Sequence, residues 1–397
     1  MKRDRQWLKE VAALAVEEVR PRLERLCRLI HANPELGFRE SRASAWLTEF
    51  LAERGFEVES GLCGMPTSFR ASWGRGAPCV AFLAEYDALP EVGHACGHNL
   101  VGTASAGAAV GLARALEQGG LEGTVCVFGC PAEEGAVEGA GGKVVLVEQG
   151  AFSGVDAALM FHPAAYTAVA VATTSREALE FAFRGKAAHA AGAAWEGINA
   201  LEAAIQTFNA INALRQHLPD GVRVHGIITR GGAAPNVVPE YAEVRLYVRA
   251  PDQTLLAQAV ERVKACARGA AMATGAQVSV RPFARPYQSL LTNRPLAEAL
   301  LENLRALGAS VEDPTPRAAG STDMGNVSRV VPAVHAYVQM VAGCVPHTPE
   351  FAAAANSPRA LKAAVLAAKA LAMTGVDLAV DPELRTQVKA AFDASCP

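Results

Sequence analysis

The strongest constraint on the fold is the alternation of apolar, strand-like runs with a helical segment in the first 170 residues. The strand-like runs are residues 78–86, 123–131 and 156–163, and small residues and leucines recur at helical spacing over 102–120. A strand, a helix and a second strand in that order predict a parallel sheet in an α/β domain. In such sheets, ligands bind beyond the carboxyl ends of the strands.

The pattern changes after residue 173, which indicates an inserted module. Two helices on one face of a four-stranded antiparallel sheet would make this module a compact α+β unit. Its expected strands are residues 173–185, 223–232, 242–250 and 276–283. Its expected helices are residues 198–218 and 255–275.

The α/β pattern resumes at about residue 286. A helix over 295–308, a strand over 333–340 and a helix over 357–375 continue it. We therefore predict one catalytic domain, made of residues 1–173 and 286–397, interrupted by a smaller domain of residues 174–285.

Composition excludes several classes of protein. A chain of 397 residues, with 51% hydrophobic and 19% charged residues, is typical of a globular protein of two domains. The net charge of −3 lacks the basic excess of nucleic-acid-binding proteins. The N-terminus does not resemble a secretion signal, and no apolar run reaches the length of about eighteen residues that a membrane span needs. Nine cysteines without paired spacing argue against disulfides and favour a location in the cytoplasm.

Polar residues crowd the segment that follows the first strand, where Glu85, Asp87, His94, Cys96 and His98 lie within fourteen positions. Cys96 and His98 are two residues apart on an expected loop, and a thiolate with an imidazole suits borderline-soft divalent metals. Taken alone, this pair is weak evidence for a metal and favours a structural role.

Four further candidates are separated along the chain. Glu133 and Glu134 follow the second strand, His162 ends the third, and His347 lies in a proline-bounded loop. Each has an ordinary explanation by itself, as an acidic turn or as a histidine at a strand edge or in a loop. Adjacent glutamates also suit a metal ligand beside a general base, because the second carboxylate can take a proton from water activated by the metal.

Together, one thiolate, three imidazoles and a carboxylate would supply five ligands. Five are too many for a single catalytic zinc ion, which must keep an open position. They suit two metal ions about 3.5–4 Å apart that share one ligand. Since a thiolate can bridge two metals and an imidazole cannot, Cys96 is the expected bridge.

Seven motifs follow one another along the chain in the order of a known family: HANPELGFRE (31–40), AEYDALPEVGHACGHN (84–99), PAEEG (131–135), FHP (161–163), GKAAHA (185–190), NVVPE (236–240) and HTPEF (347–351). In these motifs the chain resembles the M20 metallopeptidase/amidohydrolase family over nearly its whole length. It is most similar to the cysteine-containing branch of N-acyl amino acid amidohydrolases, and 84–99 and 320–328 are closest to its β-alanyl-lysine dipeptidase-like and aminobenzoyl-glutamate hydrolase-like members. The resemblance implies a mixed-sheet, di-metal exopeptidase-like catalytic domain with an inserted lid and dimerisation domain.

The resemblance also implies roles for the candidate residues of the catalytic domain. Cys96 would bridge the metals, Glu134 and His347 would complete one coordination shell, and His98 and His162 the other. Glu133 would be the general base, and Asp87 a carboxylate that orients a ligand.

Two neighbouring residues fit this pattern less directly. His94 is close enough in sequence to be an alternative ligand. Glu85 departs from the common pattern of the branch, in which an arginine often precedes an Ala-Asp pair, and would alter the charge around the ligands rather than the mechanism.

In the inserted domain, the resemblance implies that His189 reaches into the active site of a partner subunit and stabilises the oxyanion. Asn236 and Arg249 would hold the carboxylate of the substrate, with His225 as a further residue facing the site. Without the motifs, His189 would be a surface histidine and Arg249 an ordinary arginine at a strand end.

We expect an enzyme that hydrolyses the amide bond of a small N-acyl amino acid or dipeptide, by metal-bound hydroxide with Glu133 as general base. Two divalent ions per subunit are expected, manganese or zinc first, with cobalt or nickel also suitable. Alternatives are a hydrolytic deaminase or other C–N hydrolase on the same site, and a non-catalytic metal- or carboxylate-binding protein. A thiol redox protein would need a second cysteine at C-x-x-C spacing from Cys96. The expected partners are the substrate and a second copy of the chain, joined through the inserted domain.

Overall fold

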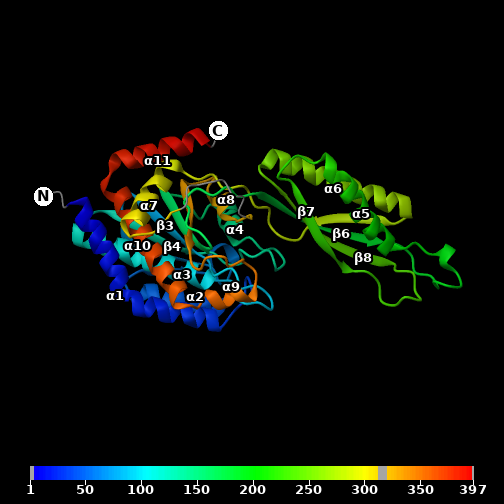
Figure 1. Ribbon diagram of the computed structural model, residues 1–397, viewed down its shortest axis with the longest axis horizontal. Coiled ribbons are helices and arrows are strands. Elements are labelled where there is room, and N and C mark those ends of the chain that lie inside the picture. The colour runs from blue at the N-terminus through cyan, green and yellow to red at the C-terminus, as the bar shows by residue number, and fades with distance from the viewer. Residues whose placement is uncertain (1–3, 312–319, 396–397) are drawn as a thin grey trace. The chain divides into compact units, whose positions relative to one another are not determined.

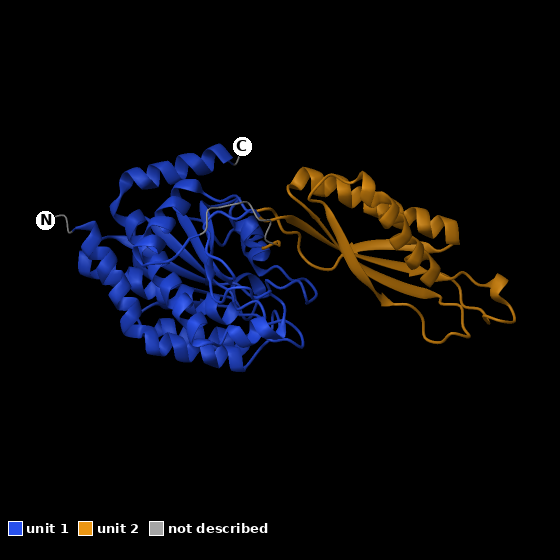
Figure 2. Cartoon of the chain, viewed as in Figure 1, with its two compact units in different colours: residues 1–172, 290–319, 323–397 blue, residues 173–289, 320–322 orange. Residues whose placement is uncertain are grey.

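A computed structural model describes residues 4–311 and 320–395. The chain divides into two compact units, and the second consists of Thr173–Ser289 with Gly320–Thr322 (Figure 2). This unit continues past residue 285 because Tyr287 and Arg176 exchange two backbone hydrogen bonds of 2.8 and 2.9 Å. Gly320 joins it through a 2.9 Å hydrogen bond from the backbone nitrogen of Thr174.

The first unit is built on a six-stranded sheet in which parallel and antiparallel pairs are mixed. The strands β3, β4, β5 and β10 run parallel, and β1 and β2 extend the sheet in antiparallel fashion from β4. The mixed α/β fold class predicted from the sequence is therefore confirmed. In spatial order the strands are β1 (Glu57–Ser60), β2 (Phe69–Arg75), β4 (Gly123–Gly129), β3 (Cys79–Ala84), β5 (Ala157–Ala164) and β10 (Ala333–Gln339).

Helices cover both faces of this sheet (Figure 1). The larger core lies where α1 (Arg5–Ala32), α3 (His98–Gly119) and α10 (Pro358–Val380) pack together, and α4 (Gly142–Glu148) and α8 (Met324–Val327) contribute to a second core. Because 78% of its most apolar window is buried, α10 is a core helix, although it is long and apolar enough to span a membrane. The remaining helices are α2 (Ser41–Ala52), α7 (Arg294–Ala306), α9 (Pro349–Ala354) and α11 (Pro382–Ser395), with the 3₁₀ turn η1 (Leu62–Gly64).

The second unit is a four-stranded antiparallel sheet with two helices, as the sequence predicts. Along β8, buried residues alternate with half-buried ones, and the buried set packs into one core with α5 and α6. Figure 1 shows both helices lying over the same face of the sheet. In spatial order the strands are β7 (Arg223–Arg230), β8 (Tyr241–Ala250), β6 (Ser175–Arg184) and β9 (Gln277–Pro282). The helices are α5 (Ala200–Leu214) and α6 (Gln253–Thr274), and the 3₁₀ turns are η2 (Ala194–Glu196) and η3 (Arg215–His217).

Candidate metal centre

The carboxyl ends of β3, β4 and β5 bring the predicted polar side chains of the first unit together. His347 joins them from the loop before α9, where its backbone nitrogen donates a 2.9 Å hydrogen bond to the carbonyl oxygen of Ala95. The segment after β3 carries Glu85, Asp87, Cys96 and His98, the segment after β4 carries Glu133 and Glu134, and β5 carries His162.

A left-handed glycine sets the angle between Cys96 and His98. Gly97 has φ 78°, and a Cβ atom there would lie 2.5 Å from Cγ of Pro163, so only glycine fits. His98 is the first residue of α3, which starts before the predicted 102–120. The prediction that His98 lies on a loop is therefore wrong; the helix starts early because Gly97, which offers no capping side chain, serves as its N-cap.

The donor atoms of the five predicted ligands form two groups that share Cys96. Cys96, His98 and His162 make one group, and Cys96, Glu134 and His347 make the other, with the donor atoms of each group within 4.8 Å of one another. Sγ of Cys96 lies 3.4 Å from Nε2 of His162. Oε1 of Glu134 lies 3.7 Å from Nε2 of His347. Two cations with one shared thiolate match this arrangement.

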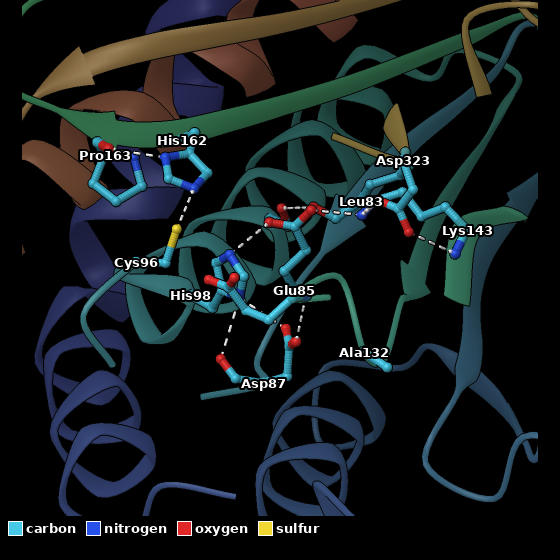
Figure 3. A network of polar contacts seen from close by, with 12 residues as sticks. Leu83, Glu85, Asp87, Cys96, His98, Ala132, Lys143, His162, Pro163 and Asp323 are labelled. Atoms are coloured by element: carbon cyan, nitrogen blue, oxygen red, sulfur yellow. Dashed lines mark hydrogen bonds and ion pairs between the residues drawn. The ribbon is translucent and has the colours of Figure 1, made fainter. Parts of the chain in front are cut away.

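In the first group, a contact at Nδ1 orients each imidazole ring. Nδ1 of His98 lies 2.7 Å from Oδ1 of Asp87, so Nε2 points away from Asp87 and toward the donor group (Figure 3). Nδ1 of His162 donates to the carbonyl oxygen of Pro163 at 2.8 Å, which likewise leaves Nε2 for a ligand role. Fixing one ring nitrogen in this way is typical of histidines that bind metals.

The chemistry of these atoms fits divalent cations. Nε2 of His98 and Oε1 of Glu134 are buried and make no hydrogen bond within residues 4–311 and 320–395. A buried polar atom without a partner costs about 1–3 kcal/mol, and a cation would remove that cost. Burial also raises the pKa of the Cys96 thiol and lowers the pKa of His162 to about 4. A bound cation favours the thiolate and the neutral imidazole that coordination needs.

Glu133 lies between the donor groups and a buried charge cluster. One of its oxygens is within 4.8 Å of donor atoms of His98 and Glu134, and an oxygen of Glu133 is equally close to carboxylates of Glu85 and Asp323. Desolvation of the carboxyl group is the largest cause that holds the pKa of Glu133 well above its ordinary value, and the charges of Glu85 and Asp323 add to it. A raised pKa suits a group that accepts and returns protons.

The charge cluster consists of Glu85, Lys143 and Asp323, which are fully buried (Figure 3). Nζ of Lys143 lies 2.5 Å from Oε1 of Glu85 and 2.5 Å from Oδ1 of Asp323. Burial opposes charge on Glu85, but Lys143 and the neighbouring histidines hold its pKa down at about 2. Lys143 and Asp323 were missed from the sequence, although Asp323 lies inside the 320–328 motif and Lys143 directly follows the Gly-rich run 135–142.

His94 does not join either donor group. Its Nε2 lies 3.1 Å from the carbonyl oxygen of Ile30, and its ring stacks on His31 with centroids 6.1 Å apart. The structure therefore gives no support to His94 as an alternative ligand.

The four candidate residues of the second unit form two separate pairs. Nε of Arg249 lies 3.2 Å from Nε2 of His225, and an Arg249 terminal nitrogen donates to Oγ of Ser321 at 2.8 Å. His189 and Asn236 make the other pair, joined where the backbone nitrogen of Ala190 donates to the Asn236 carbonyl oxygen at 3.0 Å.

These two pairs lie at opposite ends of the sheet. Arg249 pairs with Arg176 at one end of the β6–β8 ladder. The pair of Arg184 and Tyr241 forms the other end, and the chain continues from Arg184 to His189. Eight residues of strand separate the two ends, which is about 26 Å. One small ligand cannot contact His189 and Arg249 of the same unit.

Comparisons with known proteins agree with this geometry. Residues 81–374 match the sequence model of a protein family that is described as peptidase family M20/M25/M40. Xaa-Arg dipeptidase from Mus musculus is 40% identical over 405 residues, which cover 97% of this chain and 92% of that protein. One p-aminobenzoyl-glutamate hydrolase subunit from Escherichia coli K12 is 38% identical over 313 residues, 74% of this chain and 64% of that protein.

A solved structure extends the similarity to the arrangement of the chain. A dinuclear metal-binding peptidase of the M20 family from Bacillus subtilis matches with a TM-score of 0.63 at 25% identity. The match covers 91% of this chain and 99% of that one.

Proposed function

The chain belongs to peptidase family M20/M25/M40 and is a metal-dependent enzyme that hydrolyses amide bonds, and we propose that its substrates are dipeptides. The observation that carries this proposal is the pair of donor groups sharing Cys96 at the carboxyl ends of the strands. Dipeptides rank before other N-acyl amino acids because the dipeptidase from Mus musculus aligns over nearly the whole chain, whereas the aminobenzoyl-glutamate hydrolase aligns over less of it.

We propose that Cys96 bridges two divalent ions, with Glu134 and His347 on one and His98 and His162 on the other. Manganese or zinc is the first choice, and cobalt or nickel also suits sulfur, nitrogen and oxygen donors. When bound, the ions supply Lewis-acid polarisation of the scissile carbonyl and activation of water.

The side chains around the donor groups divide the remaining work. Glu133 accepts a proton from the attacking water and returns it to the leaving amine. Asp87 holds His98 in the tautomer that leaves Nε2 free to coordinate. In the second unit, Arg249 offers its guanidinium to the substrate carboxylate, with His225 beside it. Asn236 lies with His189 at the other end of the sheet and would therefore act with His189 in the site of a second subunit.

We propose that the enzyme works as a homodimer. Because His189 and Arg249 lie at opposite ends of the same sheet, His189 of one subunit would donate to the oxyanion in the site of the other. The edge strand β7 also exposes Ile227, which is 64% exposed, beside Ile228, and an apolar strand edge is typical of a surface that pairs with a second copy. The eight described cysteines are free thiols, which supports the cytoplasm as the location.

The test is a panel of dipeptides and N-acyl amino acids, assayed with protein loaded separately with manganese and with zinc. Release of a free amino acid from dipeptides, abolished by chelation and restored by metal, is the expected result. Ammonia release without amino-acid release would replace peptide hydrolysis by deamination on the same site. No turnover of any substrate by protein with two bound ions would contradict the proposal.

A further inference from the structure

The guanidinium of Arg249 is held at two of its nitrogens by side chains of the second unit. Its Nε donates to Nε2 of His225 at 3.2 Å, and its Nη1 donates to Oγ of Ser321 at 2.8 Å. His225 lies on β7, whereas Ser321 belongs to the short segment Gly320–Thr322, which packs with this unit. Because a guanidinium is a rigid planar fork, contacts at two different nitrogens fix both its position and its plane.

The groups around Ser321 determine the direction of each hydrogen bond. A guanidinium only donates, so Oγ of Ser321 accepts from Arg249. The hydroxyl of Thr174 donates its one hydrogen to the carbonyl oxygen of Gly320 at 3.1 Å. The 2.9 Å contact between the two hydroxyls therefore takes its hydrogen from Ser321. A continuous chain of hydrogen bonds thus runs from Arg249 through Ser321 and Thr174 to Gly320.

This chain of hydrogen bonds ends on backbone that the sheet fixes. The carbonyl oxygen of Gly320 also accepts the backbone N–H of Thr174 at 2.9 Å, and Thr174 directly precedes β6. At the start of β6, Arg176 pairs in register with Arg249 of β8. Ser321 therefore connects the start of one strand to a side chain near the end of its neighbour.

A purely structural role for Ser321 explains only part of this arrangement. The two hydrogen bonds from Thr174 to the carbonyl oxygen of Gly320 tie the segment to β6, and neither involves the serine hydroxyl. The bond that the hydroxyl accepts from Arg249 is charge-assisted, and such bonds are roughly twice as strong as neutral ones. A long arginine side chain that is ordered before the substrate arrives also loses less entropy on binding.

We propose that Ser321 is a positioning residue for Arg249, which it holds in the orientation that binds the carboxylate of the substrate. This inference rests on the proposed function, in which Arg249 contacts that carboxylate. A guanidinium grips a carboxylate through two parallel N–H···O bonds, which require a fixed plane. Loss of the Ser321 hydroxyl should therefore weaken the binding of substrates with a free carboxylate and leave the chemical step unchanged.

A double-mutant cycle tests whether Ser321 acts through Arg249. Ser321→Ala, Arg249→Ala and the double variant are compared with the wild type. The probes are the dipeptide that the wild type hydrolyses fastest and the same dipeptide with a C-terminal amide. Ser321→Thr keeps the hydroxyl and is the rescue variant, and Ser279→Ala makes the same chemical change at an exposed position of β9 as the matched control. Elemental analysis and circular dichroism check that each protein is metal-loaded and folded.

We expect Ser321→Ala to raise KM for the dipeptide about tenfold, with kcat nearly unchanged. Its kinetics on the amide should match those of the wild type, and Ser321→Thr and Ser279→Ala should stay close to the wild type on both probes. In the Arg249→Ala background, Ser321→Ala should add almost no further loss.

Three results would each overturn the positioning role. These are a wild-type KM in Ser321→Ala, equal losses on dipeptide and amide, and a full further loss in the Arg249→Ala background. A wild type that hydrolyses dipeptide and amide equally well would show that Arg249 does not bind the carboxylate, which defeats this inference but leaves peptide hydrolysis intact. A wild type that hydrolyses no dipeptide would defeat the proposed function itself.

Discussion

Oδ1 of Asp87 lies 2.7 Å from Nδ1 of His98, while Oδ2 of the same carboxylate accepts the backbone N–H of Glu134 at 2.9 Å. One side chain thus positions a ligand from each of the two donor groups. The relative placement of the two proposed ions depends on Asp87, although Asp87 belongs to neither group.

Replacing Asp87 by asparagine should therefore weaken metal binding. The amide keeps the shape but offers only one acceptor, so either His98 or the Glu134 N–H loses its partner. We expect affinity to fall about 10–100-fold, measured by dialysis against buffered zinc followed by elemental analysis. Wild-type affinity for both ions in this variant would contradict the orienting role.

Glu133→Gln should separate metal binding from catalysis. The amide cannot take up a proton, so turnover should fall by about 10²–10⁴. Because the proposed ligand is Glu134 and not Glu133, the variant should still bind two ions. Activity close to wild type would reject Glu133 as the base, and loss of one ion would make it a ligand instead.

The fold and the donor set were predictable because their signals are local in sequence. Glu134 and Cys96 lie in the segments that follow apolar runs, which places them beyond the ends of strands, and a parallel sheet brings such ends together. No pattern in the neighbouring sequence predicts the charge cluster of Glu85, Lys143 and Asp323. Lys143 contacts partners 58 and 180 residues away, and nothing near it in sequence distinguishes it from an exposed lysine at the start of a helix.

The N-terminus of α3 was missed for a different physical reason. Helix starts are usually marked by a serine, threonine, aspartate or asparagine cap, but Gly97 occupies that position here. The glycine is required by the close approach of Pro163, which is distant in sequence and brought near only by the fold.

Glu40 gives the metal-free protein a pH-dependent stability. Its buried carboxylate accepts the N–H of Ala132 at 2.9 Å and the hydroxyl of Thr67 at 2.8 Å. Burial, followed by the charge of Asp87, raises its pKa to about 7. Since the folded pKa exceeds the unfolded value of about 4.3, the native state holds the extra proton, and the free energy of unfolding falls as the pH rises from about 4.3 to 7.

The variant Glu40→Gln should remove that decline. It imitates the protonated acid, so it should match the wild type at pH 4 and exceed it at pH 8 by up to about 4 kcal/mol. Urea unfolding of the metal-free proteins across this range measures the difference, with Glu59→Gln on the exposed strand β1 as the matched control. Parallel curves for wild type and Glu40→Gln would rule out the titration of Glu40 as the cause.

Metal should protect the thiol of Cys96 selectively. A coordinated thiolate cannot be alkylated readily, whereas chelation should expose Cys96 to reagent. Cys63 and Cys266 are also partly exposed and lie in neither donor group, so their labelling should not respond to metal. Peptide-level mass spectrometry after alkylation, with and without chelator, measures each site. Equal labelling of Cys96 in both states would exclude it as the bridge.

The proposed action of His189 across a dimer can be tested by mixing two inactive variants. His189→Ala keeps an intact metal centre but lacks the oxyanion donor, and Glu133→Gln keeps His189 but lacks the base. In a mixed dimer, His189 from the Glu133→Gln subunit should complete the metal centre of the His189→Ala subunit. Random exchange should then restore roughly a quarter of wild-type activity, because half of the dimers are mixed and each has one complete site. If His189 acts within its own subunit, no pairing creates a complete site, and the mixture should stay as inactive as its components.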